Sequence, residues 1–81
     1  MKKERQEMKA VIRELIEGQR QRVLKLANRI NPGLTLDDLW QPNDFPELEF
    51  DPLFRYEEGV WHGMEAVLVA LQGSQNQERK E

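Results

Sequence analysis

Three residues in the last third of the chain have the side chains and the spacing to bind a metal ion. Glu58, His62 and Glu65 stand at i, i+4 and i+7, so a helix would place all three on one side. Carboxylates and imidazoles are common ligands of divalent metals. On a helical wheel, however, they fall opposite the apolar positions Leu53 and Val60 and should face water. The sequence therefore offers at most a weak metal site, and solvated side chains are the simpler interpretation.

No set of residues predicts an enzyme. Paired carboxylates for acid–base catalysis could come from Asp37, Asp38, Glu57 and Glu58. Adjacent acids near helix starts are, however, ordinary partners of the helix dipole. The chain has no cysteine, which excludes a thiol nucleophile and a disulfide framework and favours the cytoplasm. The sequence therefore predicts no catalytic residue and no cofactor.

The charges are distributed unevenly along the chain. Residues 1–30 hold nine Lys/Arg against four Asp/Glu, whereas residues 31–65 hold nine Asp/Glu against one Arg. Lys9, Arg13 and Arg20 form a basic stripe that could bind nucleic-acid phosphates. The net charge of -3 argues against this role. The simpler interpretation is a basic helix that packs along an acidic segment, within one chain or across a dimer.

The middle third of the chain combines aromatic and acidic residues. Left exposed, such a set forms an apolar centre with an acidic rim, as protein-binding patches do. Buried, it forms the small core that seals a loop onto its helices. The candidate partner-binding residues are Trp40, Asp44, Phe45, Glu47, Glu49, Phe54 and Trp61.

Two long amphipathic helices must position these residues. From about residue 3 to about residue 31 apolar residues recur at spacings of three and four, and Asn31-Pro32-Gly33 then ends the helix. Asp51 and Pro52 supply an N-cap and a first-turn proline for a second helix over about residues 52–72. Gly73 should end it, and residues 74–81, which hold no large apolar residue, should form a disordered tail.

The connection between the two helices is acidic and rich in proline. Thr35 can cap a short helix over about residues 35–40, and a loop should follow over residues 41–50. Three of its apolar residues, Phe45, Leu48 and Phe50, should lie on the long helices.

The second helix carries more apolar surface than one neighbouring helix can cover. One stripe, expected to form the core, comprises Leu53, Val60, Met64, Val67 and Leu71. One flank holds Phe54, Trp61 and Leu68. The other flank holds small residues, Gly59, Gly63, Ala66 and Ala70, where another helix could approach closely. A glycine inside a helix costs about 1 kcal/mol relative to alanine, so close packing should offset this cost.

The first helix contains one polar residue within its apolar stripe. Gln19 could form a polar layer that sets register and subunit number in a helical interface. The alternative is a mild kink that brings the polar side chains to water.

These features predict an all-α fold in a single domain over residues 1–73: a helical hairpin of two long helices with a short helix and a Pro-rich loop between them. An 81-residue chain buries a smaller fraction of its surface than a typical domain does, so a partner subunit is expected to add stability. We therefore expect a homodimeric four-helix bundle, with Gln19 and the small-residue flank in the packing. In the alternative, a compact monomer, residues 34–50 cover the second helix.

The leading hypothesis for function is a non-catalytic protein-interaction module. It would be a small cytoplasmic adaptor or regulator that presents the acidic, aromatic surface to an unidentified protein partner. The alternative is a nucleic-acid-associated regulator that uses the basic face of the first helix, and the third hypothesis is the weak metal site described above. No apolar run is long enough for a signal peptide or a membrane span, so no membrane association is expected.

Overall fold

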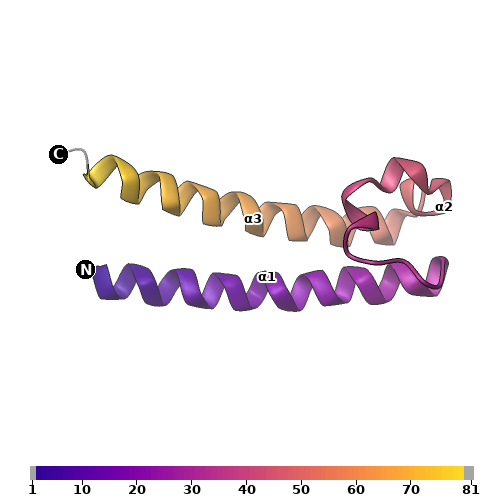
Figure 1. The fold of residues 1–81 in the computed structure, drawn as a ribbon, viewed down its shortest axis with the longest axis horizontal. Coiled ribbons are helices and arrows are strands. Elements are labelled where there is room, and N and C mark those ends of the chain that lie inside the picture. The colour runs from indigo at the N-terminus through magenta and orange to yellow at the C-terminus, as the bar shows by residue number, and fades with distance from the viewer. Residues whose placement is uncertain (1, 80–81) are drawn as a thin grey trace.

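Two long antiparallel helices dominate the structure, a computed structural model that describes the backbone of residues 2–79 and the side chains of residues 3–73. Helix α1 spans Lys2–Ile30 and helix α3 spans Pro52–Arg79 (Figure 1). Between them lie two 3-10 turns, η1 at Asp38–Trp40 and η2 at Pro42–Asp44, and the one-turn helix α2 at Pro46–Glu49. Residues 2–79 contain no strand. The all-α hairpin predicted from the sequence is confirmed.

The turn after α1 is held by the side chain of Asn28. Its Nδ2 donates hydrogen bonds to the carbonyl oxygens of Leu24 and Leu34, each at 3.0 Å, and its Oδ1 accepts one from the N–H of Gly33 at 2.8 Å. Gly33 has φ of 95°, a left-handed conformation that a glycine adopts without strain. The Asn-Pro-Gly signal therefore ends the helix at Ile30, as the sequence predicts to within one residue.

The connection forms single turns instead of the predicted short helix over residues 35–40 and loop over residues 41–50. Asp38 Oδ2 accepts hydrogen bonds from the N–H of Thr35 at 2.9 Å and from its hydroxyl at 3.1 Å. Proline lacks an N–H and disfavours helical geometry in the residue before it, so Pro42 and Pro46 restrict each helical segment to about one turn.

The start of α3 agrees with the capping signal in the sequence. Asp51 Oδ1 accepts a hydrogen bond from the N–H of Phe54 at 2.8 Å, and Pro52 is the first helical residue. Nearby, Asn31 Nδ2 donates to Glu47 Oε1 at 2.7 Å and ties the end of α1 to α2. The direction in which α3 leaves the connection is therefore set by local hydrogen bonds.

The end of α3 differs from the prediction, because the helix continues through Gly73 to Arg79. Gly33 is the one residue of the described chain with a positive φ, so Gly73 keeps helical geometry. Inside a helix a glycine costs about 1 kcal/mol relative to alanine, which does not force an end. Residues 80–81 of the predicted tail lie outside the described part of the chain.

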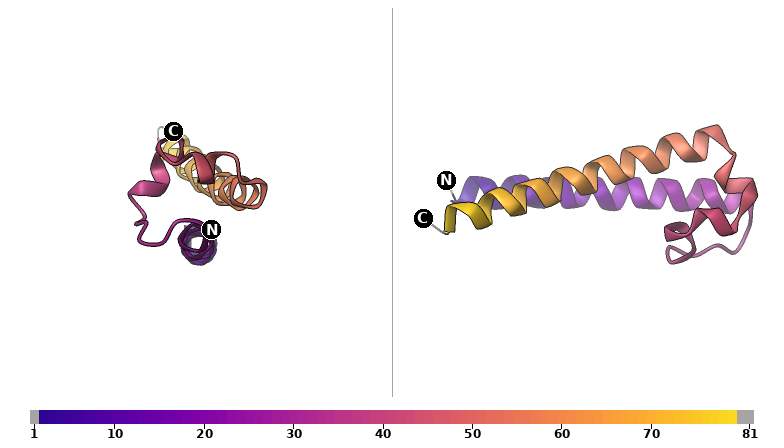
Figure 2. Two further views of the ribbon diagram at one scale, coloured as in Figure 1. Left: turned by 90° about the vertical axis from the view of Figure 1, so that its right-hand side faces the viewer. Right: turned by 90° about the horizontal axis from the view of Figure 1, so that it is seen from above.

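The core lies at the end of the hairpin that carries the connection. Its buried residues are Ile16, Val23 and Ala27 of α1, Leu34, Leu39 and Leu48 of the connection, and Phe54 and Trp61 of α3. Figure 2 shows the connection folded back over one side of the helix pair, with the other side left bare. Phe50 departs from the prediction, because 78% of it is exposed.

Helix α3 packs on α1 through a different stripe from the one predicted. Phe54 and Trp61 are 0% and 1% exposed, whereas Leu53 and Val67, which were expected in the core, are more than half exposed. Aromatic side chains bury the largest apolar areas, so turning the aromatic flank toward α1 removes more surface from water. Helix α3 is therefore rotated about its axis relative to the prediction, and its remaining faces point in other directions than expected.

Candidate functional site

The side of the hairpin opposite the connection is an apolar surface, here called the open face. It is formed by Met8, Val11 and Leu15 of α1 and by Leu53, Val60, Val67 and Leu71 of α3. Met8, Val11, Leu15, Leu53 and Val67 are between 51% and 55% exposed. The α3 residues of this face belong to the stripe predicted to be the core, of which Met64 does pack against the core. A single chain therefore leaves in water a surface of the kind that mediates association.

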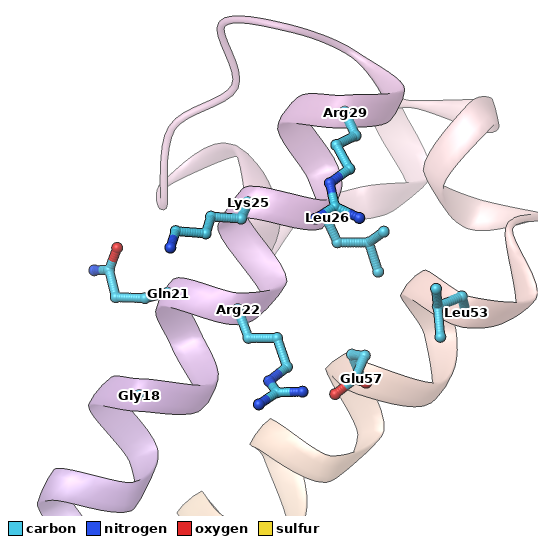
Figure 3. A pocket seen from close by; sticks show the side chains of 8 residues that line it. All are labelled: Gly18, Gln21, Arg22, Lys25, Leu26, Arg29, Leu53 and Glu57. Atoms are coloured by element: carbon cyan, nitrogen blue, oxygen red, sulfur yellow. The ribbon is translucent and has the colours of Figure 1, made fainter.

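A basic groove occupies the open face near the connection. It lies between α1 and α3, has a volume of about 450 Å³, and is lined by Gly18, Gln21, Arg22, Lys25, Leu26, Arg29, Leu53 and Glu57 (Figure 3). Met8, Leu15, Arg22 and Arg29 recur every seven residues on α1, as Leu53, Val60 and Val67 do on α3. Residues seven apart lie on one side of a helix, so the groove and the apolar residues share one face.

The cations of the groove have no anionic partner of their own. No ion pair within the described residues involves Arg22, Lys25 or Arg29. The side chain of Arg22 extends toward α3 and the carboxylate of Glu57 in Figure 3. The groove therefore combines an apolar floor, Leu26 and Leu53, with a rim of excess positive charge.

The basic stripe predicted from the sequence does not form a continuous surface. Lys9 is buried, and Arg20 is half-buried with its Nη1 3.3 Å from Glu17 Oε2. Arg13 alone of the three is exposed. The cations that do share a surface are those of the groove, and their i, i+3, i+7 spacing was the signal in the sequence that could have identified them.

Gln19, expected in the packing of a dimer, forms a polar layer between the two helices of one hairpin. It is 8% exposed, and its Nε2 donates to Glu57 Oε1 at 2.7 Å and to the Glu57 carbonyl oxygen at 2.9 Å. Both helices belong to the same chain. The pair sets the register of α1 against α3, because a shifted α3 would leave buried Gln19 and half-buried Glu57 without these partners.

The small-residue flank of α3 faces away from α1. Gly59, Gly63, Ala66 and Ala70 are all exposed. A Cβ atom added at Gly59 or Gly63 would meet no other atom within 4 Å. The flank therefore makes no close helix contact within one chain, and it borders the open face.

The predicted partner-binding residues divide between core and surface. Phe54 and Trp61 lie in the core, where they support the surface without being part of it. Trp40 is 54% exposed and stacks on His62, with ring centroids 5.9 Å apart and ring planes 9° apart. Its ring centroid is also 4.7 Å from that of Trp61.

The other predicted residues of the connection lie at the same end of the hairpin as Trp40. Asp44 and Glu47 are exposed, and Phe45 and Glu49 are half-buried. Phe50 of the connection and Tyr56 of α3, 78% and 68% exposed, are two large rings that the predicted set omits. Here the acidic, aromatic surface means the exposed residues of the connection, Trp40, Asp44, Glu47 and Phe50. The sequence gives no clear signal that Phe50 and Tyr56 are exposed, because periodicity alone does not show which aromatic residues face the core.

The three candidate metal ligands do not converge on one point. Glu58 is buried, and its Oε1 lies 3.1 Å from Arg55 Nη1. His62 stacks on Trp40, and Glu65 is half-buried. The expectation that all three face water is wrong for Glu58, because α3 is rotated. No group of three or more His, Asp or Glu side chains in the described chain could hold a metal ion.

Two further observations concern the chain as a whole. None of the described helices combines the length and the apolar character needed to cross a membrane. Comparisons with protein-family models, with curated protein sequences and with solved structures gave no significant match.

Proposed function

We propose that this chain is a non-catalytic protein-interaction module, a small cytoplasmic adaptor or regulator that works as a homodimeric four-helix bundle. The observation that carries the proposal is the open face, where five large apolar residues are each about half exposed. Two such hairpins packed face to face would form the four helices of a bundle and remove both faces from water. The acidic, aromatic surface would then remain free for a protein partner.

The size of the chain supports association. An 81-residue hairpin has few fully buried side chains, and its core is concentrated at one end. At roughly 25 cal/mol per Å² of apolar surface removed from water, burying the open face adds stability that the single hairpin lacks. The free space around Gly63 beside this face leaves room for a second helix backbone.

The test is the solution mass, measured by light scattering across a dilution series, with one matched pair of variants. Val67 lies on the open face, whereas Val69 is 65% exposed on the opposite side of α3. We expect a dimer for the unmodified chain and for Val69→Glu, and a folded monomer for Val67→Glu. A monomer for the unmodified chain at all concentrations, or a Val67→Glu variant that remains fully dimeric, would contradict the proposal.

Partner binding by the acidic, aromatic surface needs a separate experiment. The immobilised chain is compared with a Trp40→Ala/Phe50→Ala variant that remains folded and dimeric. We expect the unmodified chain to capture a defined polypeptide in stoichiometric amount. The variant should not capture it, since exposed aromatic rings dominate such contacts. Equal capture by both chains would exclude this surface as the binding site.

Nucleic-acid binding is the second candidate, and the basic groove is the observation that favours it. Phosphate binding weakens steeply as salt rises, because counterions are released from the nucleic acid. A titration with duplex DNA and with single-stranded RNA at two salt concentrations tests it. Salt-dependent binding that is lost in an Arg22→Glu/Arg29→Glu variant would favour this candidate over the protein-interaction module.

A further inference from the structure

We propose that the two copies pack with their connections at opposite ends, so that the basic groove of each receives the Met8 end of α1 from the other. The inference rests on the homodimer proposed above and specifies its geometry. Each groove would take in the partner copy's Met8 and Val11 over the floor of Leu26 and Leu53. In each copy Glu4 and Glu7, beside Met8, would lie near the groove cations of the other.

The charges along α1 favour this orientation. Glu4, Glu7, Met8, Val11 and Ile12 line a second hollow near the start of the helix. Glu4 and Glu7 are exposed, and no ion pair among the described residues involves either of them. The open-face row of α1 is thus acidic at its start, apolar up to Leu15 and basic beyond Gly18. Antiparallel pairing of two such rows places unpaired acids opposite unpaired cations.

The opposite orientation has a cost in repulsion. With both connections at one end, the two basic grooves would face each other across the dyad. Each groove contains Arg22, Lys25 and Arg29 but a single carboxylate, that of Glu57. This carboxylate already accepts a hydrogen bond from Gln19. Like charges placed together at an interface oppose association, so this arrangement is disfavoured.

Gly18 of α1 and Gly63 of α3 lie at about the same distance along the hairpin. In antiparallel pairing about the middle of α1, Leu15 of each copy lies beside Gly18 of the other, and on α3 Val60 lies beside Gly63. A Cβ atom added at Gly18 or Gly63 would meet no other atom within 4 Å. Gln19 contacts Glu57, and Arg22 lines a groove with Glu57, so the middle of α1 lies beside residues 60–63. One twofold axis can therefore relate both the two copies of α1 and the two copies of α3.

The first experiment measures where the two connections lie. The chain has no cysteine, so Pro32→Cys, exposed just beyond the end of α1, provides one labelling site per chain at the connection end of the hairpin. Spin labels in the dimer should give a distance comparable to the 48 Å length of the chain's longest axis. A short distance, or rapid formation of a disulfide between copies, would place the connections together and overturn the proposal.

The second experiment reverses the charges. Glu4→Lys/Glu7→Lys and Arg22→Glu/Arg29→Glu should each weaken the dimer by about tenfold or more, because each change affects two symmetric contacts. Both changes in one chain should restore most of the affinity. Arg13→Glu, exposed on the other side of α1, is the control and should leave the affinity unchanged. A stronger dimer for Arg22→Glu/Arg29→Glu would indicate that the two grooves face each other.

The outcomes separate this proposal from the one on which it rests. A chain that is monomeric at all concentrations refutes the homodimer itself. A dimer that shows a short distance between the labels, or no rescue by the combined charge changes, keeps the homodimer and refutes the antiparallel orientation.

Discussion

One hydrogen-bonded polar pair sets how the two long helices align. Gln19 and Glu57 form a charge-assisted pair at 2.7 Å within an interface that is otherwise largely apolar. Trp61, four residues after Glu57 on α3, is buried, and its Nε1 has no hydrogen-bond partner among the described residues. The Gln19–Glu57 pair specifies the register of the helices. The Trp61 indole stabilises the fold through the apolar area that it buries.

Changing Gln19 to Ala should lower the free energy of unfolding by about 1 to 3 kcal/mol, because a half-buried carboxylate loses its donor. The measurement is urea denaturation followed by circular dichroism. A double-mutant cycle with Glu57→Ala should show coupling, with the double variant less destabilised than the sum of the single changes. Additive effects would mean that the hydrogen bond contributes nothing to stability.

The aromatic residues differ in cost according to where the structure places them. Trp61→Ala should lower the free energy of unfolding by about 3 to 5 kcal/mol, since it empties a fully buried site. Phe50→Ala, at a site 78% exposed, should change it by less than about 0.5 kcal/mol. Thermal denaturation of both variants checks this, and equal effects would contradict the division between core and surface.

At the scale of the elements, each helix begins or ends where short-range hydrogen bonds permit. Asn28 holds the turn after α1, and Asp51 caps α3. The prolines of the connection limit its helices to single turns. The end of α3 has no such local signal beyond Gly73, and the helix continues there.

Asp51→Ala should lower the free energy of unfolding by about 1 kcal/mol, because the N–H of Phe54 loses its side-chain acceptor at the start of α3. Asp51→Asn keeps an acceptor oxygen and should recover most of the loss. Chemical denaturation of the two variants compares them. If both are equally destabilised, the charge of Asp51, through the helix dipole, matters more than the hydrogen bond.

At the scale of the whole molecule, the hairpin has two different sides. The connection covers one side, and the open face with its basic groove occupies the other. In the compact monomer considered from the sequence, residues 34–50 cover the second helix. The connection does cover part of α3, because Leu39 and Leu48 share a core with Trp61. It leaves the open face on the other side uncovered (Figure 2), and we propose that a second copy covers that face.

Gly63→Leu should weaken the proposed dimer by about 1 to 3 kcal/mol, because a branched side chain would occupy the space proposed for a second backbone. It should not harm the single hairpin, since nothing lies within 4 Å of the added Cβ and leucine is the better helix former. Light scattering and thermal denaturation at several concentrations separate the two effects. Gly63→Ala is the control, and a fully dimeric Gly63→Leu would exclude this flank from the interface.

The two long helices could be predicted from the sequence, because the Asn-Pro-Gly stop, the Asp-Pro start and the spacing of apolar residues act within a few positions. The end of α3 and the single turns of the connection could not. The face of α3 that meets α1 depends on tertiary packing, because a helix apolar over more than half its circumference can pack in several rotations. Burial of Phe54 and Trp61 settled that choice. This packing places most of the predicted core stripe on the open face, although Met64 stays against the core. It also turns Glu58 inward and leaves Arg22, Lys25 and Arg29 around a groove.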